Sequence, residues 1–228
     1  MKGTVKEITY QQASDFLLPK HYSGRLPVVS KAFGWFFDND LKAVITFGKP
    51  ASPSLCKGIC GDEWSDKVYE LNRLCRTDDL QEPLSQFVSY CLRKLKKNDW
   101  IIVSYSDTAM SHHGYIYQAC NFIYTGLTPQ RSDTYTGDKH SRHYTKGFGK
   151  GVIRKIRSSK HRYVYFCTND RRLRGYWLDT LKYPIKPYPK GNNKNYELGE
   201  YIKEKYVSPG CTESFTLREW LDKLLGGE

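Results

Sequence analysis

The stretch WIIVSYSDTAMSHHGYIYQACNFIYTG, residues 100–126, joins an apolar run to a dense group of polar side chains. Its first six residues, up to Tyr105, are typical of a buried strand, and residues 122–125 predict a second strand. A short glycine-containing helix is expected between the two, over residues 112–121. In open α/β sheets, ligands bind where strands end and helix N-termini begin. The stretch therefore predicts a sheet protein whose chemistry is centred on residues 104–126.

The sequence on either side predicts further strands and helices. Apolar residues alternate along 33–37 and 41–47 around an Asp-Asn-Asp turn, which is typical of a β-hairpin. From Pro83 onward, apolar residues recur at helical spacing and are followed by lysines, as expected of an amphipathic helix. The remaining predictions are a strand and helix within 6–21, a loop over 50–66, and strands over 68–74 and 161–167.

This order of elements predicts an α/β or α+β fold with a mixed central sheet flanked by helices. A hairpin gives antiparallel neighbours, whereas helical crossovers favour parallel ones. We divide the chain into a catalytic core over 1–130, a basic extension of the same domain over 131–182, and a tail over 183–228. The tail holds a proline-bearing connection and a C-terminal helix, for which Thr216 and Glu219 form a capping box.

Positive charge is concentrated in one part of the chain. The formal net charge of +12 arises almost entirely within residues 127–210, because residues 1–126 are nearly neutral. Between residues 131 and 165, cations alternate with aromatic rings, a mixture that contacts phosphates and stacks on bases. A solvated charged face is the alternative. We predict nucleic-acid contacts at Arg131, Lys139, Arg142, Lys146, Arg154, Lys155, Arg157, Lys160 and Arg162.

The polar residues after the strand at 100–105 are candidates for chemistry. Asp107 has the position of a general base, a metal ligand or a helix N-cap, and the three remain open. His112 and His113 have the side chains of an acid, a base or a ligand. Tyr117 lies one helical turn after His113, so the two share a helix face. A Tyr at that position has a proton to give a leaving group, and core packing is the alternative.

Several other functions lack their signatures. The chain has neither a Gly-Lys-Ser/Thr phosphate loop nor a dinucleotide-binding glycine fingerprint. Two pairs, Cys56 with Cys60 and His140 with His143, form only a weak zinc pattern. The seven cysteines are irregularly spaced, which favours reduced thiols in a cytosol. The N-terminus lacks a signal-peptide core, and no apolar run reaches the roughly 20 residues of a membrane span. We expect no membrane partner.

Three ordered motifs carry a resemblance to a known family. They are Tyr69-Glu-Leu-Asn-Arg-Leu74, Val103-Ser-Tyr-Ser-Asp107, and the run from His113 to Gly126. Together they strongly resemble the Mom family of bacteriophage proteins, which modify adenines in DNA. The resemblance implies a GCN5-related N-acetyltransferase-like fold and conversion of the exocyclic amine of adenine to an acetamido (carbamoylmethyl) group. This modification protects phage DNA from restriction nucleases, which implies location in the bacterial host cytoplasm.

The same resemblance implies roles for individual residues. Asp107 and Tyr117 match functionally important positions, as base or metal ligand and as acid or substrate contact, with Ser106 and His113 as further catalytic candidates. His21 and His112 are candidates for an iron site. An acyl-CoA such as acetyl-CoA, or another activated small donor, would bind where two central strands separate. Its phosphates would lie near the following loop, for which the candidates are Arg73, Leu74, Cys75 and Arg76.

The usual glycine-rich motif of that loop is replaced here by residues 73–79, which contain no glycine. The DNA partner would be double-stranded with its target adenine flipped out of the helix. Two alternatives remain open at this point. One is an acyltransferase acting on amines of RNA or protein, and the other is a non-catalytic DNA-binding protein.

Overall fold

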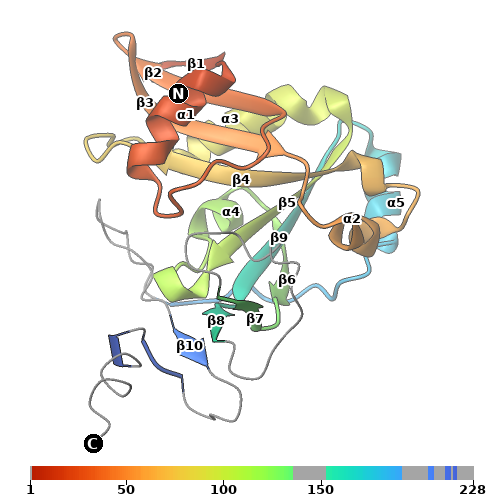
Figure 1. The fold of residues 1–228 in the computed structure, drawn as a ribbon. Helices are drawn as coiled ribbons and strands as arrows, with labels where there is room; N and C mark the ends of the chain where they lie inside the picture. The colour runs from red at the N-terminus through yellow and green to blue at the C-terminus, as the bar shows by residue number, and fades with distance from the viewer. Residues whose placement is uncertain (1, 136–152, 192–204, 208–213, 217, 220–228) are drawn as a thin grey trace, which may run out of the picture.

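The computed structural model describes residues 2–135, 153–191, 205–207, 214–216 and 218–219. Its centre is a seven-stranded sheet in the order β1-β2-β3-β4-β5-β9-β6 (Figure 1). All neighbours in this sheet are antiparallel except β4 and β5, which are parallel. The predicted mixed sheet is therefore confirmed. The strands are β1 (Thr4–Glu7), β2 (Lys31–Phe37), β3 (Asp40–Gly48), β4 (Val68–Arg76), β5 (Trp100–Asp107), β6 (Ile123–Leu127) and β9 (Lys160–Cys167).

Helices cover both faces of this sheet. On one face, α3 (Leu84–Leu95) and α4 (Tyr115–Ala119) pack against a cluster that includes Phe47 and Ile102. On the other face, α2 (Pro53–Cys60) and α5 (Arg171–Asp179) pack against Ile101 and Val103, and α1 (Tyr10–Lys20) packs on Val44. Consecutive residues of a strand point to opposite faces. The continuous apolar run in β5 is explained by this burial on both sides.

Local sequence signals explain several element boundaries. Asp38 and Asn39 have φ angles of 48° and 71°, the left-handed conformation that a tight hairpin turn between β2 and β3 requires. The helix predicted after Pro83 is α3, with five residues of its apolar stripe buried. Helix α1 begins with a capping box, in which the side chains of Thr9 and Gln12 each accept a hydrogen bond from the other's backbone N–H.

Two helical regions differ from the sequence-based prediction. The loop predicted over 50–66 is wrong for residues 53–60, which form α2 with Ser52 as its N-cap. The Gly, Pro and Ser residues of this segment indicated a loop, but the segment also contains an apolar pair, Cys56 and Ile59, which is buried against Trp177. Helix α5 was not predicted. The helix expected over 112–121 covers only 115–119, because Gly114 and Asn121 have left-handed φ angles of 77° and 60°, and a 3-10 turn, η3 (Thr108–Met110), precedes it.

A second, three-stranded sheet lies beside the core, in the order β10-β8-β7. Its strands are β7 (Arg131–Thr134), β8 (Arg154–Arg157) and β10 (Tyr206–Val207). The predicted capping box at Thr216 and Glu219 is present, with both reciprocal hydrogen bonds. Most of the predicted C-terminal helix lies outside the described residues. The domain division stays a prediction, although β9 of the basic extension lies within the central sheet.

The parallel strands β4 and β5 separate partway along their length. Their pairing ends at Leu71 and Ser104, whereas β4 remains paired with β3 as far as Arg76. Strand β5 likewise stays paired with β9 as far as Asp107. At the point of separation, the Ser104 hydroxyl donates a hydrogen bond to the Leu71 carbonyl oxygen, 2.9 Å away. The result is a wedge-shaped opening in the middle of the sheet.

Two further findings concern the described residues as a whole. Their six cysteines are all free and buried, as the odd count and irregular spacing predict. None of their helices has the length and apolar character needed to cross a membrane.

Candidate active site

A cavity of about 440 Å³ occupies the wedge between β4 and β5. One wall is the end of α1 and the loop after it, and the other is formed by α4 and the residues just before it. The lining includes residues from both segments and from both strands. These are Lys20, His21, Tyr22, residues 70–78, Leu84, Tyr105, Ser106, His112, residues 114–117 and Lys160. Of the predicted catalytic residues, Ser106 and Tyr117 line this cavity.

Tyr117 lies at the base of the cavity among other aromatic rings. Its ring centroid is 5.4 Å from that of Phe122 and 5.4 Å from that of Tyr163. Burial raises the pKa of its hydroxyl, and a hydrogen bond with Ser104 opposes that rise. Tyr117 is therefore a neutral hydroxyl throughout the physiological range, able to donate a proton in a hydrogen bond.

The chain before Tyr117 is fixed by close backbone contacts. Gly114 has a φ of +77°, and a Cβ there would lie 2.5 Å from the Tyr163 ring. The Tyr163 hydroxyl and the Gln118 amide both donate to the carbonyl oxygen of His113. The ring of His113 lies 5.7 Å from that of His161 and 6.2 Å from that of Tyr115, and His113 does not line the cavity. Its carbonyl oxygen, bonded to Tyr163 and Gln118, fixes the start of α4.

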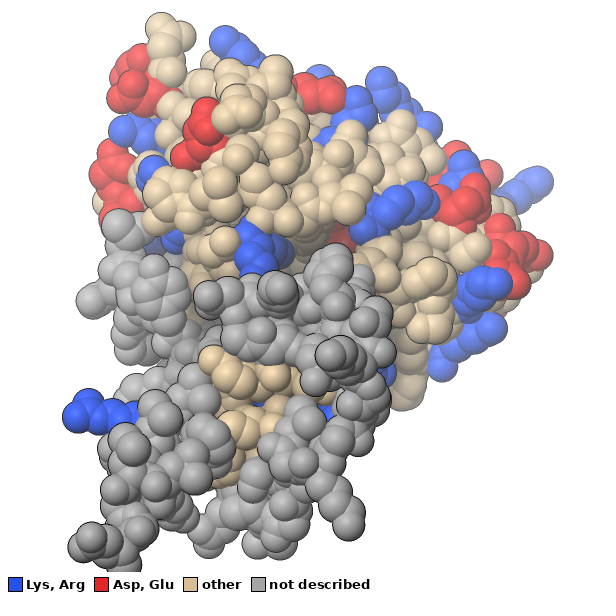
Figure 2. All heavy atoms as spheres, in the orientation of Figure 1, with Lys and Arg blue, Asp and Glu red and all other residues tan. Residues whose placement is uncertain are grey.

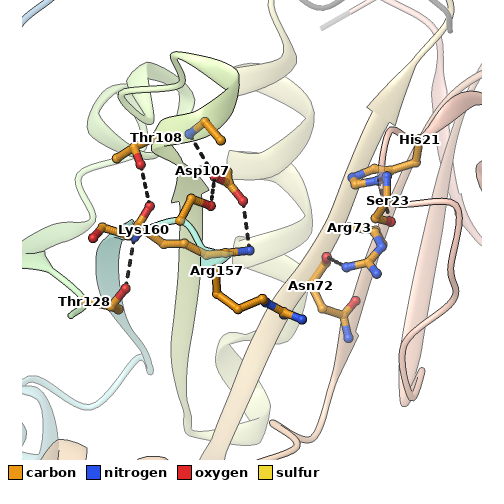
Figure 3. A network of polar contacts seen from close by, with 12 residues as sticks. His21, Ser23, Asn72, Arg73, Asp107, Thr108, Thr128, Arg157 and Lys160 are labelled. Carbon is orange, nitrogen blue, oxygen red and sulfur yellow. Dashed lines mark hydrogen bonds and ion pairs between the residues drawn. The ribbon is translucent and has the colours of Figure 1, made fainter. Parts of the chain in front are cut away.

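Asp107 is buried behind the cavity, with 3% of its surface exposed, and does not line it. Its Oδ1 accepts hydrogen bonds from the Ala109 backbone N–H at 3.0 Å and from the Ser158 hydroxyl at 2.5 Å. Its Oδ2 lies 3.1 Å from Lys160 Nζ (Figure 3). Burial alone would raise the pKa of Asp107, but Lys160, Ser158 and the Ala109 N–H together hold it below its usual value. Asp107 is therefore an ionised N-cap of η3, as one of the sequence alternatives expects.

Glu70 of β4 is a carboxyl group that does line the cavity. Burial raises its pKa, and the positive charges of Arg73 and Lys160 oppose that rise. Sequence reasoning quoted Glu70 only as part of a motif and assigned it no role. A polar residue in a strand between apolar neighbours was the available signal. Tyr105 lines the same region, and burial raises the pKa of its hydroxyl.

The four candidates for donor binding all line the cavity, but their side chains differ in what they contact. Arg73 donates from Nε and Nη2 to the carbonyl oxygen of Arg25, at 3.2 and 3.0 Å, which ties the loop after α1 to β4. Arg76 donates from Nη1 to the carbonyl oxygen of Leu80 at 3.0 Å. Leu74 is half-buried, and Cys75 is buried.

The residues at this end of the cavity fit a phosphate group. Leu84, the first residue of α3, lines the cavity, so a helix N-terminus faces it. A guanidinium has five N–H donors, and a single bond to Leu80 leaves Arg76 able to bind an anion. Asp78 also lines this end. The neighbouring Asp79 is offset by Lys42, whose Nζ lies 2.8 Å from it.

The two metal candidates, His21 and His112, both line the cavity. The rings of both contact Tyr22, with centroids 4.5 Å and 6.1 Å away. His21 Nδ1 accepts the Ser23 backbone N–H at 3.1 Å, so a neutral ring carries its proton on Nε2. Burial and the nearby charges of Arg73, His112 and Lys160 lower the pKa of His21 to about 3.

Three or more His, Cys, Asp or Glu side chains do not gather anywhere in the described part of the chain. The residues that the structure describes around His21 and His112 therefore do not fit the expected iron site. The weak zinc pattern stays untested: Cys56 and Cys60 are buried in α2, and His140 and His143 lie outside the described residues.

Six of the nine predicted nucleic-acid residues lie on β7, β8 and β9. Several are held by neighbours: Arg154 donates to Ser132, and Arg157 pairs with Asp133 at 3.2 Å. Arg162 lies 3.3 Å above the Tyr183 ring. In the view of Figure 2, cationic and acidic side chains are interspersed over the described core. Lys139, Arg142 and Lys146 lie outside the described residues.

The fold and this site define a mixed α/β protein with a polar, aromatic cavity where two parallel central strands separate. The chain belongs to the Mom protein family, whose sequence model matches residues 2–190. It is 26% identical over 208 residues to the methylcarbamoylase mom of Escherichia phage Mu, covering 82% of this chain and 83% of that protein.

Solved acetyltransferase structures are also similar to the chain. An N-acetyltransferase from Staphylococcus aureus Mu50 has a TM-score of 0.46 at 9% identity, covering 74% of this chain and 100% of that one. An acetyltransferase from Bacillus subtilis in complex with CoA has a TM-score of 0.43 at 18% identity, covering 72% and 99%.

Proposed function

We propose that this protein is a transferase that converts the exocyclic amine of adenine in DNA to an acetamido (carbamoylmethyl) derivative. The observation that carries the proposal is the cavity, in which a carboxyl group, a lysine and several tyrosines surround a space of about 440 Å³. Membership of the Mom family and similarity to a methylcarbamoylase support the group transferred. The biological consequence would be protection of phage DNA from restriction in the host cytoplasm.

The cavity suits a single planar base more than a base pair. An enzyme that acts on a base within a duplex must flip it out, at an unstacking cost of a few kcal/mol. Aromatic rings compensate by stacking, a contribution of about 1–3 kcal/mol per base. Tyr22, Tyr105, Tyr115 and Tyr117 all line the cavity and can form this environment.

Adenine needs help to react, because its exocyclic amine is delocalised into the ring and is a poor nucleophile. That nitrogen must lose a proton as its new bond to carbon forms. Glu70 is the lining carboxyl whose burial makes it a stronger base than an exposed glutamate. We assign Glu70 as the proton acceptor and Tyr117 as a proton donor to the leaving group or a contact to the base. Ser106, which is 5% exposed, is assigned to orienting the substrate.

The donor would bind at the other end of the cavity. Arg76 and the first turn of α3 would hold the phosphates of an acyl-CoA or similar activated molecule, with Leu74 and Cys75 beside it. The product joins the adenine nitrogen to a methylene carbon, so acyl transfer alone does not make it. The transferred carbamoylmethyl group must carry its leaving group on that methylene carbon, and the leaving group departs as the C–N bond forms and the amine proton passes to Glu70. Arg73 contributes by fixing the loop after α1 as a cavity wall.

The test is nucleoside mass spectrometry of DNA from bacteria that express the chain. The wild type should yield modified adenine, whereas Glu70→Gln and Tyr117→Phe should each lower the yield by at least about 100-fold, the contribution of a general acid or base. Glu7→Gln is the matched control, since Glu7 is an exposed carboxyl that pairs with Lys31 on the far edge of the sheet. Melting temperatures verify that each variant folds.

The outcomes separate the alternatives. Unmodified adenine from wild-type cells would refute the proposed function and leave a DNA-binding protein or an acyltransferase for RNA or protein amines. Full modification by Glu70→Gln would refute only the assignment of the proton acceptor. The pH dependence is a further check. Since the pKa of Glu70 is raised, the wild-type rate should increase with pH through a pKa above that of an ordinary glutamate.

A further inference from the structure

The ion pair between Asp107 and Lys160 connects a buried carboxylate to the cavity. Asp107 is 3% exposed and does not line the cavity, whereas Lys160 is 36% exposed and does. An ammonium group has three N–H donors, and Asp107 Oδ2 accepts one of them at 3.1 Å. The part of the pair that can meet a ligand is therefore the lysine.

Both ends of the Lys160 side chain are held in place. Its backbone N–H donates to the Thr128 hydroxyl at 2.9 Å, and its residue lies opposite Asp107 in the β5–β9 register. The preceding turn is fixed as well, because the Thr108 hydroxyl donates to the Ser159 carbonyl oxygen at 2.7 Å. Ser158 anchors the carboxylate from the same turn. A flexible lysine loses side-chain entropy when it is ordered, and here folding has already taken up part of that cost.

The ammonium acts across the cavity on the opposite wall. Lys160 lines the same cavity as Glu70 and His21, and its charge opposes the rise in the pKa of Glu70 and contributes to the fall in the pKa of His21. Figure 3 shows Lys160 with Asp107 on one side of β4, and His21 and Arg73 on the other. Along the chain, Lys160 follows β8, which belongs to the three-stranded sheet β10-β8-β7 and carries Arg154, Lys155 and Arg157. Lys160 thus lies at the junction between that sheet and the cavity.

We propose that the Lys160 ammonium binds the DNA phosphate next to the adenine that enters the cavity, and that Asp107 is a positioning residue that holds this ammonium. The proposal rests on the proposed function, because it takes a nucleotide as the ligand. A base that swings into the cavity leaves its phosphate at the entrance, and a partly exposed cation at that place matches it. The pairing of Asp107 with both Ser158 and Lys160 explains why a carboxylate is needed at a position that no substrate reaches.

The experiment measures binding of a fluorescent adenine-containing DNA duplex by anisotropy over a range of salt concentrations. Loss of one phosphate contact reduces the slope of log K against log salt by about 0.9. Lys160→Met should show this reduction and weaker binding, whereas Lys160→Arg should keep the wild-type slope. Lys57→Met is the matched control, because Lys57 is an exposed residue of α2 that pairs with Asp62 at 3.0 Å. The double variant Asp107→Asn with Lys160→Met removes both charges and serves if the single variant is poorly folded.

Kinetics distinguish a positioning role for Asp107 from a direct one. Asp107→Asn should raise KM for DNA by roughly 10-fold, the effect of weakening one hydrogen bond to a charged group, and change kcat far less. A fall in kcat of about 100-fold or more with unchanged DNA affinity would instead identify a general base and overturn the positioning role. If Lys160→Arg keeps the wild-type KM for DNA and Lys160→Met does not, the site needs a positive charge at this position.

A phosphate of the acyl-CoA donor is the other anion that Lys160 could bind. CoA binding measured by calorimetry distinguishes this phosphate from a DNA phosphate. The DNA assignment requires CoA affinity to be equal in the wild type and Lys160→Met. If Lys160→Met lost CoA affinity and kept its DNA slope, the assignment to DNA would be overturned. If wild-type protein failed to bind the duplex at all, the proposed function would fail. If it bound and modified DNA with an unchanged slope in Lys160→Met, the present inference alone would fail.

Discussion

Replacing Asp107 by Asn should destabilise the protein, because this carboxylate joins three parts of the chain. It caps η3 through the Ala109 N–H, accepts from Ser158 and pairs with Lys160. Hydrogen bonds to charged groups contribute about 1.5–3 kcal/mol each. An asparagine whose amide oxygen takes the place of Oδ1 keeps the contacts with Ala109 and Ser158, whereas its NH2 group in the place of Oδ2 loses the pair with Lys160. Lys160 is 36% exposed and regains water, which keeps the loss below the roughly 3–5 kcal/mol of a fully buried pair. We expect a loss of about 2 kcal/mol at neutral pH.

This loss should depend on pH in a defined direction. The pKa of Asp107 lies below its ordinary value in the folded protein, despite the opposing effect of burial. The carboxylate therefore contributes stability that is complete above the unfolded-state pKa, about 3.9, and disappears as the pH falls through the folded-state pKa. The difference between wild type and Asp107→Asn should be largest near neutrality and should shrink in acid.

Urea unfolding followed by tryptophan fluorescence measures both quantities. Asp133→Asn is the control, because Asp133 pairs with Arg157 at 3.2 Å but is 40% exposed. Such surface pairs contribute about 0–1 kcal/mol. A loss in Asp107→Asn no greater than that of the control, or a loss that stays constant down to about pH 3, would refute this account of the site.

Two other substitutions or probes test the packing around the cavity. Gly114→Ala should destabilise the protein by about 2–4 kcal/mol and abolish DNA modification, because it combines a left-handed φ of +77° with a Cβ 2.5 Å from the Tyr163 ring. Gly175→Ala, where a Cβ meets open space, should melt no lower than the wild type, and equal melting temperatures for both variants would contradict the clash. The six cysteines of the described residues should react with a thiol reagent only as the protein unfolds, since all are buried and burial raises the pKa of Cys60 to about 11 and of Cys167 to about 12. Rapid labelling of any of them in native buffer would show that its thiol is accessible in the folded protein and would contradict this prediction.

Elements with a strong repeating pattern were predictable from the sequence. The hairpin of β2 and β3, the amphipathic α3 and the apolar β5 all lie where alternation or helical spacing puts them. Helices α2 and α5 were missed because their burial depends on each other. Trp177 of α5 packs on Cys56 and Ile59 of α2, and neither helix has a long apolar stripe of its own.

The features of the site likewise divide into those that the sequence determined and those that only the tertiary structure decided. The sequence by itself determined that residues 104–126 carry polar side chains at the end of a buried strand, because that follows from local composition alone. Only the tertiary structure decided which of those side chains face the cavity. Tyr117 does, whereas Asp107 turns behind it to hold Lys160, a residue 53 positions away in the chain. Glu70 gained its importance in the same way, from the separation of β4 and β5 beyond Leu71 and Ser104. Strand separation and side-chain pairing across a sheet are long-range contacts, and no local pattern in the sequence encodes them.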